Sequence, residues 1–65
     1  MMKFAKDVNL GDRVLFDGDM WTVDGITTYT DTVVFLMELN GISTVTEYIS
    51  TTPLYVYSSN RRNSI

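Results

Sequence analysis

Residues 32–50, TVVFLMELNGISTVTEYIS, decide the fold of this 65-residue chain. In the first half, Phe35 and Met37 lie on one side of an extended chain, because side chains alternate between the two faces of a strand. Asn40-Gly41 then supplies the pair of positive-φ residues that a type I′ hairpin turn requires. The second half is rich in β-branched residues, which favour strands. The stretch therefore predicts a β-hairpin whose strands meet at this turn.

Three further strands are expected around this hairpin. Asp17-Gly18-Asp19 favours a tight turn, because glycine tolerates positive φ and aspartate bonds to its own backbone. Gly25 lies inside an expected strand, where a glycine marks a bulge or a bend. Pro53 has no backbone N–H to donate to a neighbouring strand, so it ends the strand before it, and one short 3₁₀ turn can form beside it. The expected strands are residues 13–17, 20–30, 32–40, 42–50 and 54–57.

The expected fold class is all-β, and the chain is long enough for one small domain only. We expect a five-stranded barrel over residues 1–57 and a short flexible C-terminal tail over residues 58–65, because closure removes exposed sheet edges. The composition is that of a globular protein, with 45% hydrophobic and 20% charged residues. The chain has no cysteine and no histidine, so disulfides and thiolate metal sites are excluded. Oligomerisation or very regular β structure is then the expected support for so small a core.

The order of features resembles the small SH3-like barrels, which include the KOW-type domains of ribosomal proteins and the amino-terminal domain of translation elongation factor P. The resemblance rests on Gly11-Asp12-Arg13-Val14, Trp21-Thr22-Val23 and Pro53-Leu54-Tyr55-Val56, with glycine turns between them. It implies the fold and no activity, since the lysine-bearing loop of the factor would fall at residues 28–32, which hold no lysine. The basic surface of the ribosomal members is also missing. Small acidic proteins of this kind resemble bacteriophage accessory proteins.

Acidic residues dominate the charge. Five basic residues stand against eight acidic ones, a formal net charge of −3, and Arg61 and Arg62 supply two of the five. Residues 1–57 therefore hold three basic residues against eight acidic ones, a balance of −5. We expect two of those three, Lys3 and Lys6, to be solvated. Such a surface disfavours nucleic acid and anionic membranes. The alternative is a nucleic-acid-associated protein that stacks bases on its tyrosines and holds phosphates with the Arg61/Arg62 tail.

Candidate catalytic and metal-binding groups are few. Without histidine or cysteine, a hydroxyl nucleophile lacks its usual base. Asp12, Asp17, Asp19 and Asp24 cluster in the sequence, as carboxylates for acid–base chemistry would, but turn formation explains the first three fully. Asp17-Gly18-Asp19 resembles the start of a calcium loop, yet the alternating ligands that end in glutamate are missing. We therefore expect no enzymatic activity, no catalytic residue, no metal site and no cofactor.

Two strands carry apolar residues on both faces, although a barrel has only one interior. We expect Phe35, Met37 and Val56 to point inward, and Trp21 to belong to the core. The opposite faces then carry the candidate protein-interface residues Val34, Leu36, Tyr55 and Tyr57. The alternative is that each of these strands is strongly bent, so that its two faces pack into two core regions.

The expected function is a non-enzymatic protein–protein interaction module that binds itself or another protein. An acidic rim around the outer apolar–aromatic strip would speed encounter with a basic partner. A bacteriophage accessory or host-modulating protein is one form of this expectation. The longest apolar run, residues 33–37, is far shorter than the roughly 20 residues of a membrane span, and no secretory signal precedes it. We expect a cytoplasmic protein, in the host cytoplasm if a phage encodes it.

Overall fold

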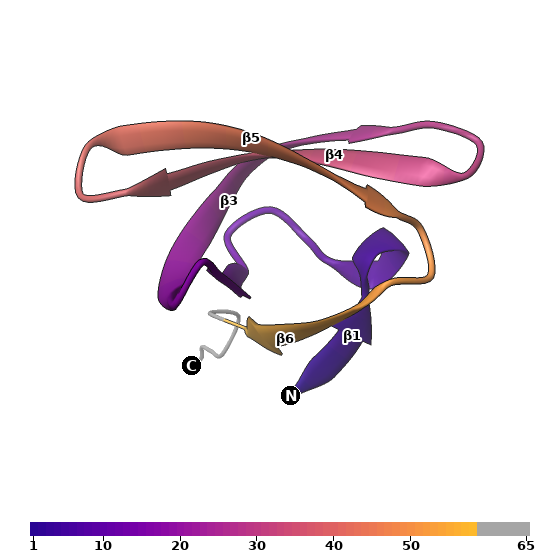
Figure 1. Cartoon of the computed structure of the whole chain (residues 1–65), viewed down its shortest axis with the longest axis horizontal. Helices are drawn as coiled ribbons and strands as arrows, with labels where there is room; N and C mark the ends of the chain where they lie inside the picture. Colours follow the sequence, from indigo (N-terminus) through magenta and orange to yellow (C-terminus); the bar gives the residue numbers. More distant parts are fainter. Residues whose placement is uncertain (59–65) are drawn as a thin grey trace, which may run out of the picture.

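The computed structural model describes residues 1–58 as one strongly curved antiparallel β-sheet (Figure 1). Its six strands lie in the order β1-β6-β2-β3-β4-β5. A 3₁₀ helix, η1, follows β1. The bounds are β1 Met2–Phe4, η1 Ala5–Asp7, β2 Arg13–Phe16, β3 Asp19–Thr28, β4 Thr32–Leu39, β5 Ile42–Ile49 and β6 Pro53–Tyr57. The all-β fold class predicted from the sequence is confirmed.

The sheet is not closed into a barrel, because the edge strands β1 and β5 do not pair with each other. Instead, η1 bonds to the connection between β5 and β6. The Ala5 N–H donates to the Thr52 carbonyl at 2.9 Å, and the Lys6 N–H donates to the Ser50 carbonyl at 3.0 Å. The expected closed barrel of five strands is therefore not observed. The β1 strand was not predicted, because three residues are too few to show a period of two. The 3₁₀ turn lies in η1 and not beside Pro53, where it was expected.

Two tight hairpin turns set the register of the sheet. Asp17 and Gly18 join β2 to β3 with φ of 53° and 84°, and Asn40 and Gly41 join β4 to β5 with φ of 51° and 84°. Consecutive positive φ angles are the signature of the type I′ turn, which matches the twist of the strands it connects. Both turns predicted from the sequence are confirmed.

A β-bulge at Asp24 interrupts the pairing of β3 with β4. Val23 lies opposite Met37 and Gly25 lies opposite Leu36, so Asp24 is the extra residue. A Cβ atom at position 25 would lie 3.3 Å from the Leu36 Cβ, which is closer than ordinary packing. The glycine thus lets Leu36 lie across the outer side of β3, as the sequence predicted when it placed a bulge or bend here.

The concave side of the sheet holds the core. Phe35, Met37 and Val56 are fully buried, which confirms their predicted inward orientation. Trp21 packs against this core as expected, and its Nε1–H donates to the Phe16 carbonyl at 3.0 Å. The other buried apolar residues are Ala5, Val8, Val14, Val23, Val33 and Leu54.

Candidate interaction surfaces

The four residues predicted to form one outer strip lie on two separate surfaces. Val34 and Leu36 lie on the convex side of β4, and Tyr55 and Tyr57 lie on the convex side of β6. Leu36 is 43% exposed, Tyr55 is 52% exposed, and Tyr57 is 48% exposed, whereas Val34 is half-buried. Because β2 and β3 lie between β6 and β4 in the sheet, the two pairs do not form a continuous strip. Their role as interface residues stays a prediction.

The first surface, the aromatic face, consists of Met2, Phe4, Pro53, Tyr55 and Tyr57. Antiparallel pairing of β1 with β6 sets Met2 opposite Tyr55 and Phe4 opposite Pro53. Residues opposite each other in a sheet share a face, so these side chains adjoin. All five are exposed. The sequence analysis found the tyrosines but not Met2 and Phe4, although their alternation with Lys3 was the available signal.

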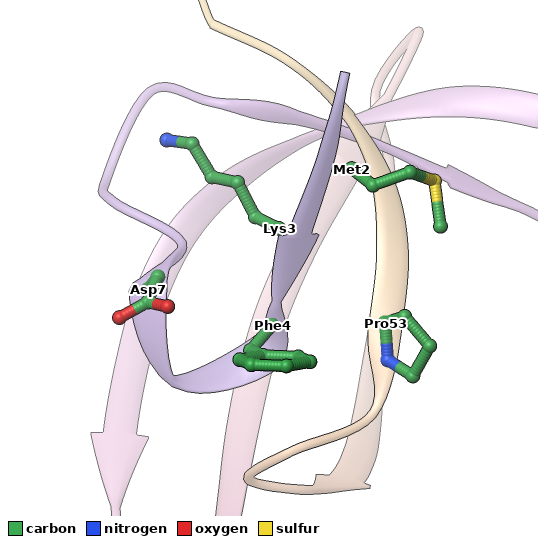
Figure 2. Close-up of a pocket in the computed structure, with 5 residues that line it drawn as sticks. All are labelled: Met2, Lys3, Phe4, Asp7 and Pro53. Atoms are coloured by element: carbon green, nitrogen blue, oxygen red, sulfur yellow. The ribbon is translucent and has the colours of Figure 1, made fainter.

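A hollow of about 430 Å³ opens at the β1 end of the aromatic face. Figure 2 shows Phe4 in the middle of its lining, Met2 and Pro53 on one side, and Lys3 and Asp7 on the other. Its lining is therefore mostly apolar, with the Lys3 side chain and the Asp7 carboxylate at one border. Within residues 1–58, Asp7 makes no hydrogen bond or ion pair through its side chain, so its charge is available to a ligand.

A buried ion pair fixes β1, and with it half of the aromatic face. The Lys3 Nζ lies 2.9 Å from Oδ2 of Asp12, whose side chain is only 3% exposed. The same carboxylate oxygen accepts a hydrogen bond from the Asn9 N–H at 2.9 Å. The expectation that Lys3 is solvated was wrong, because β1 carries its amino group over the buried carboxylate. Asp12 closes the turn before β2, as predicted, and also anchors the strand that the sequence analysis missed.

Arg13 extends the aromatic face toward β2. The register places Arg13 opposite Tyr57, and the guanidinium carbon lies 4.8 Å from the centre of the tyrosine ring. This distance is within the range of a cation–π contact. The arginine therefore contributes a flat, charged surface beside the tyrosine.

The second surface, the aliphatic face, consists of Val34, Leu36, Val45 and Ile49 on the convex side of β4 and β5, where Glu47 lies between Val45 and Ile49 and opposite Val34. Leu36 lies opposite Val45 in the pairing of these strands. Val45 is 63% exposed, and Ile49 is similarly exposed. The sequence analysis treated the β5 residues only as strand formers. Counting back from the Asn40-Gly41 turn would have placed Val45 beside Leu36.

The aspartates that cluster in the sequence do not come together in the structure. Asp12 is buried, whereas Asp17, Asp19 and Asp24 are exposed. Over residues 1–58, no three histidine, cysteine, aspartate or glutamate side chains gather as metal ligands would. Arg61 and Arg62, the candidate nucleic-acid contacts, and all of the predicted tail beyond Ser58 lie outside the described residues.

Comparisons with protein-family models, with curated protein sequences and with solved structures each gave no match. The described part of the chain holds no helix with the length and hydrophobicity of a membrane span. The candidate function therefore rests on the surfaces themselves.

Proposed function

We propose that this protein is a non-enzymatic interaction module whose aromatic face binds an apolar segment of a positively charged partner protein. The observation that carries the proposal is the row of large apolar side chains that the pairing of β1 with β6 holds together in solvent. Single exposed apolar residues are ordinary, but a contiguous group of them is typical of a binding surface. Tyrosine and methionine are among the residue types enriched in protein interfaces.

The aromatic face is held ready for binding by the fold beneath it. Tyr55 and Tyr57 alternate along β6 with Leu54 and Val56, which are buried in the core. The β6 strand pairs with β1 on one side and with β2 on the other. A surface carried on paired strands loses little conformational freedom when a ligand binds, so more of the contact energy remains as affinity.

Charge favours a basic partner. Residues 1–58 hold three basic and eight acidic side chains. The Lys3 charge is already paired with Asp12, and Arg13 lies over the Tyr57 ring at the far end of the aromatic face from Asp7. Asp7 borders the hollow beside Phe4. A lysine or arginine that follows an apolar residue of the partner can therefore reach this carboxylate while the apolar side chain contacts Phe4. The surrounding negative potential would also raise the association rate.

We further propose that the chain is related to the SH3-like barrels and that a bacteriophage encodes it. A small, curved, antiparallel sheet is compatible with the SH3-like grouping that the turn pattern suggested. A phage-encoded accessory protein that modulates a host protein in the host cytoplasm would use the same surface.

A displayed library of random peptides, selected on the full chain, tests the proposal. We expect the selected peptides to combine aromatic or aliphatic residues with lysine or arginine. Tyr55→Thr should raise the dissociation constant of a selected peptide about tenfold or more, as loss of an interface anchor does. Tyr29→Thr is the matched control, because Tyr29 is 57% exposed but lies in the turn between β3 and β4. Equal effects of the two substitutions would refute the proposed surface.

The nucleic-acid alternative is tested with a fluorescent single-stranded oligonucleotide. Binding that weakens steeply with salt and disappears when residues 58–65 are deleted would favour the Arg61/Arg62 tail over the aromatic face. We expect no binding at moderate salt. The deletion removes Arg61 and Arg62 and leaves every tyrosine in place, so it tests the tail separately from the aromatic face.

A further inference from the structure

The β5 strand presents an unpaired backbone edge. The Ser50 N–H donates to the Asp31 carbonyl at 2.8 Å, which fixes the alternation of hydrogen-bonded pairs between β4 and β5. In an antiparallel pair, only alternate residues direct their N–H and C=O groups toward the neighbouring strand. The groups of Ser43, Val45 and Glu47 therefore point away from β4. No strand within residues 1–58 pairs with that edge.

This edge has few of the features that protect exposed strands from pairing with another chain. The β5 strand is eight residues long and pairs with β4 in unbroken register. It contains no lysine, no proline and no bulge, and Glu47 is its single charged side chain. The opposite edge strand, β1, has only three residues and carries Lys3. One edge of the sheet is thus short, while the other is ready to accept a strand.

We propose that β5 pairs antiparallel with β5 of a second copy of this chain, with the two-fold axis at Val45. Such an interface is isologous, so each contact occurs twice. In this register Val45 lies opposite the second copy's Val45, and Ser43 lies opposite the second copy's Glu47. Leu36 already lies beside Val45 within one chain. The two aliphatic faces therefore join into one apolar row across four strands.

Neighbouring registers are less favourable. An axis at Glu47 would set two carboxylates directly opposite each other, and like charges in that position destabilise a sheet. An axis at Thr46 would set Val45 opposite the second copy's Glu47, an apolar side chain against a charged one. With the axis at Val45, the Ser43 hydroxyl can donate to the glutamate instead. The outward side chains of β5 are thus more complementary with the axis at Val45 than with an axis at Thr46 or Glu47.

An unsatisfied hydroxyl on the concave side of the sheet also fits a partner strand, either with the axis at Val45 or with an axis at Thr46, which would set it opposite the second copy's Thr46. Thr46 Oγ1 is buried and has no hydrogen-bond partner in the described part of the chain. Buried polar groups of folded proteins nearly always have a partner. With the axis at Val45, Thr46 lies opposite the second copy's Thr44, in the type of pair that brings side chains closest. Hydrogen bonding between two threonines across strands would then satisfy the buried oxygen.

Sedimentation of the full chain across a concentration series tests the proposed dimer. We expect a monomer–dimer equilibrium for the natural sequence. Val45→Lys should raise the dimer dissociation constant about tenfold or more, because it sets two lysines against each other at the axis. Leu15→Lys is the matched control, since it adds the same charge at an exposed apolar position on β2. A monomer at every concentration would overturn the proposal, as would equal effects of the two lysines.

A single cysteine tests the register and does not depend on whether Val45→Lys folds. The chain has no cysteine of its own, so any disulfide formed must join the introduced residues. In the proposed pairing, the Cα atoms at position 45 lie about 5.5 Å apart, within the range of a disulfide. Those at position 47 lie about 14 Å apart, four residues along the strands. We expect Val45→Cys to form a covalent dimer under mild oxidation and Glu47→Cys to remain unlinked. The reverse pattern, or a dimer without a link in Val45→Cys, would overturn the proposed register.

Discussion

Replacing Lys3 with methionine should destabilise the fold and loosen β1, which carries Met2 and Phe4 of the aromatic face. The substitution keeps a long side chain and removes the ammonium group that lies 2.9 Å from the Asp12 carboxylate. It leaves that carboxylate 3% exposed, with the Asn9 N–H as its remaining hydrogen-bond donor. The energetic cost therefore comes from a buried charge that has lost its counter-charge.

The magnitude follows from the burial of the two partners. Removing one partner of a fully buried ion pair costs roughly 3–5 kcal/mol. The Lys3 side chain is 18% exposed, and Asp12 keeps one hydrogen bond, so we expect a loss of about 2 kcal/mol. A domain of this size has a net stability of only about 3–5 kcal/mol. The melting temperature should then fall by roughly 8–16 °C.

Urea unfolding and thermal unfolding followed by circular dichroism measure this loss. Lys6→Met is the matched control, because Lys6 is exposed and has no ion pair within residues 1–58. It should change the free energy of unfolding by less than about 0.5 kcal/mol. Hydrogen exchange provides a local measurement: the Leu54 amide, which the register pairs with residue 3, should exchange faster relative to the amides of β4. Equal stability of the Lys3→Met and Lys6→Met variants would refute the buried ion pair as the anchor of β1.

Two further substitutions test single features of the sheet. Thr46→Val keeps the side-chain shape and removes the unsatisfied hydroxyl, so it should raise the stability of the monomer by about 1 kcal/mol and weaken the proposed dimer. Urea unfolding at low protein concentration measures the first effect, and sedimentation measures the second. A destabilised monomer would mean that the hydroxyl has a partner. Gly41→Ala should lower the free energy of unfolding, measured in urea, by about 1–2 kcal/mol, because φ at this position is 84° and a side chain there is strained. An unchanged free energy of unfolding would show that the turn can adopt another geometry.

The hairpins and the core could be predicted from the sequence because their signals are local. Asn40-Gly41 determines a turn type by its own backbone preferences, and the alternation around Phe35 determines which side of β4 is buried. The bulge at Gly25 was likewise marked by a glycine inside a run of strand residues. These features need no knowledge of what lies across the sheet.

The features that could not be predicted depend on contacts between distant parts of the chain. Whether Lys3 is solvated is decided by the pairing of β1 with β6, which brings it to Asp12. The sheet stays open because η1 bonds to the connection before β6 and β1 does not pair with β5, so that β5 is a free edge within residues 1–58. The division of the predicted interface strip has the same origin. Val34 and Tyr55 were assigned correctly to outer faces, but strand order determines whether outer faces adjoin.

The two proposed surfaces can operate together because they belong to different edges of one sheet. The aromatic face lies on β1 and β6, whereas the proposed dimer contact lies on β5, at the other end of the strand order. Pairing through β5 therefore leaves the aromatic face uncovered, and the dimer presents it twice. A partner with two apolar segments would then bind both copies, and the second segment would bind at the high effective concentration set by the first. The Val45→Lys variant should consequently keep its affinity for a single selected peptide and lose affinity for two copies of that peptide joined by a flexible linker. Equal affinity of the linked pair for the natural chain and for Val45→Lys would show that the two surfaces act independently.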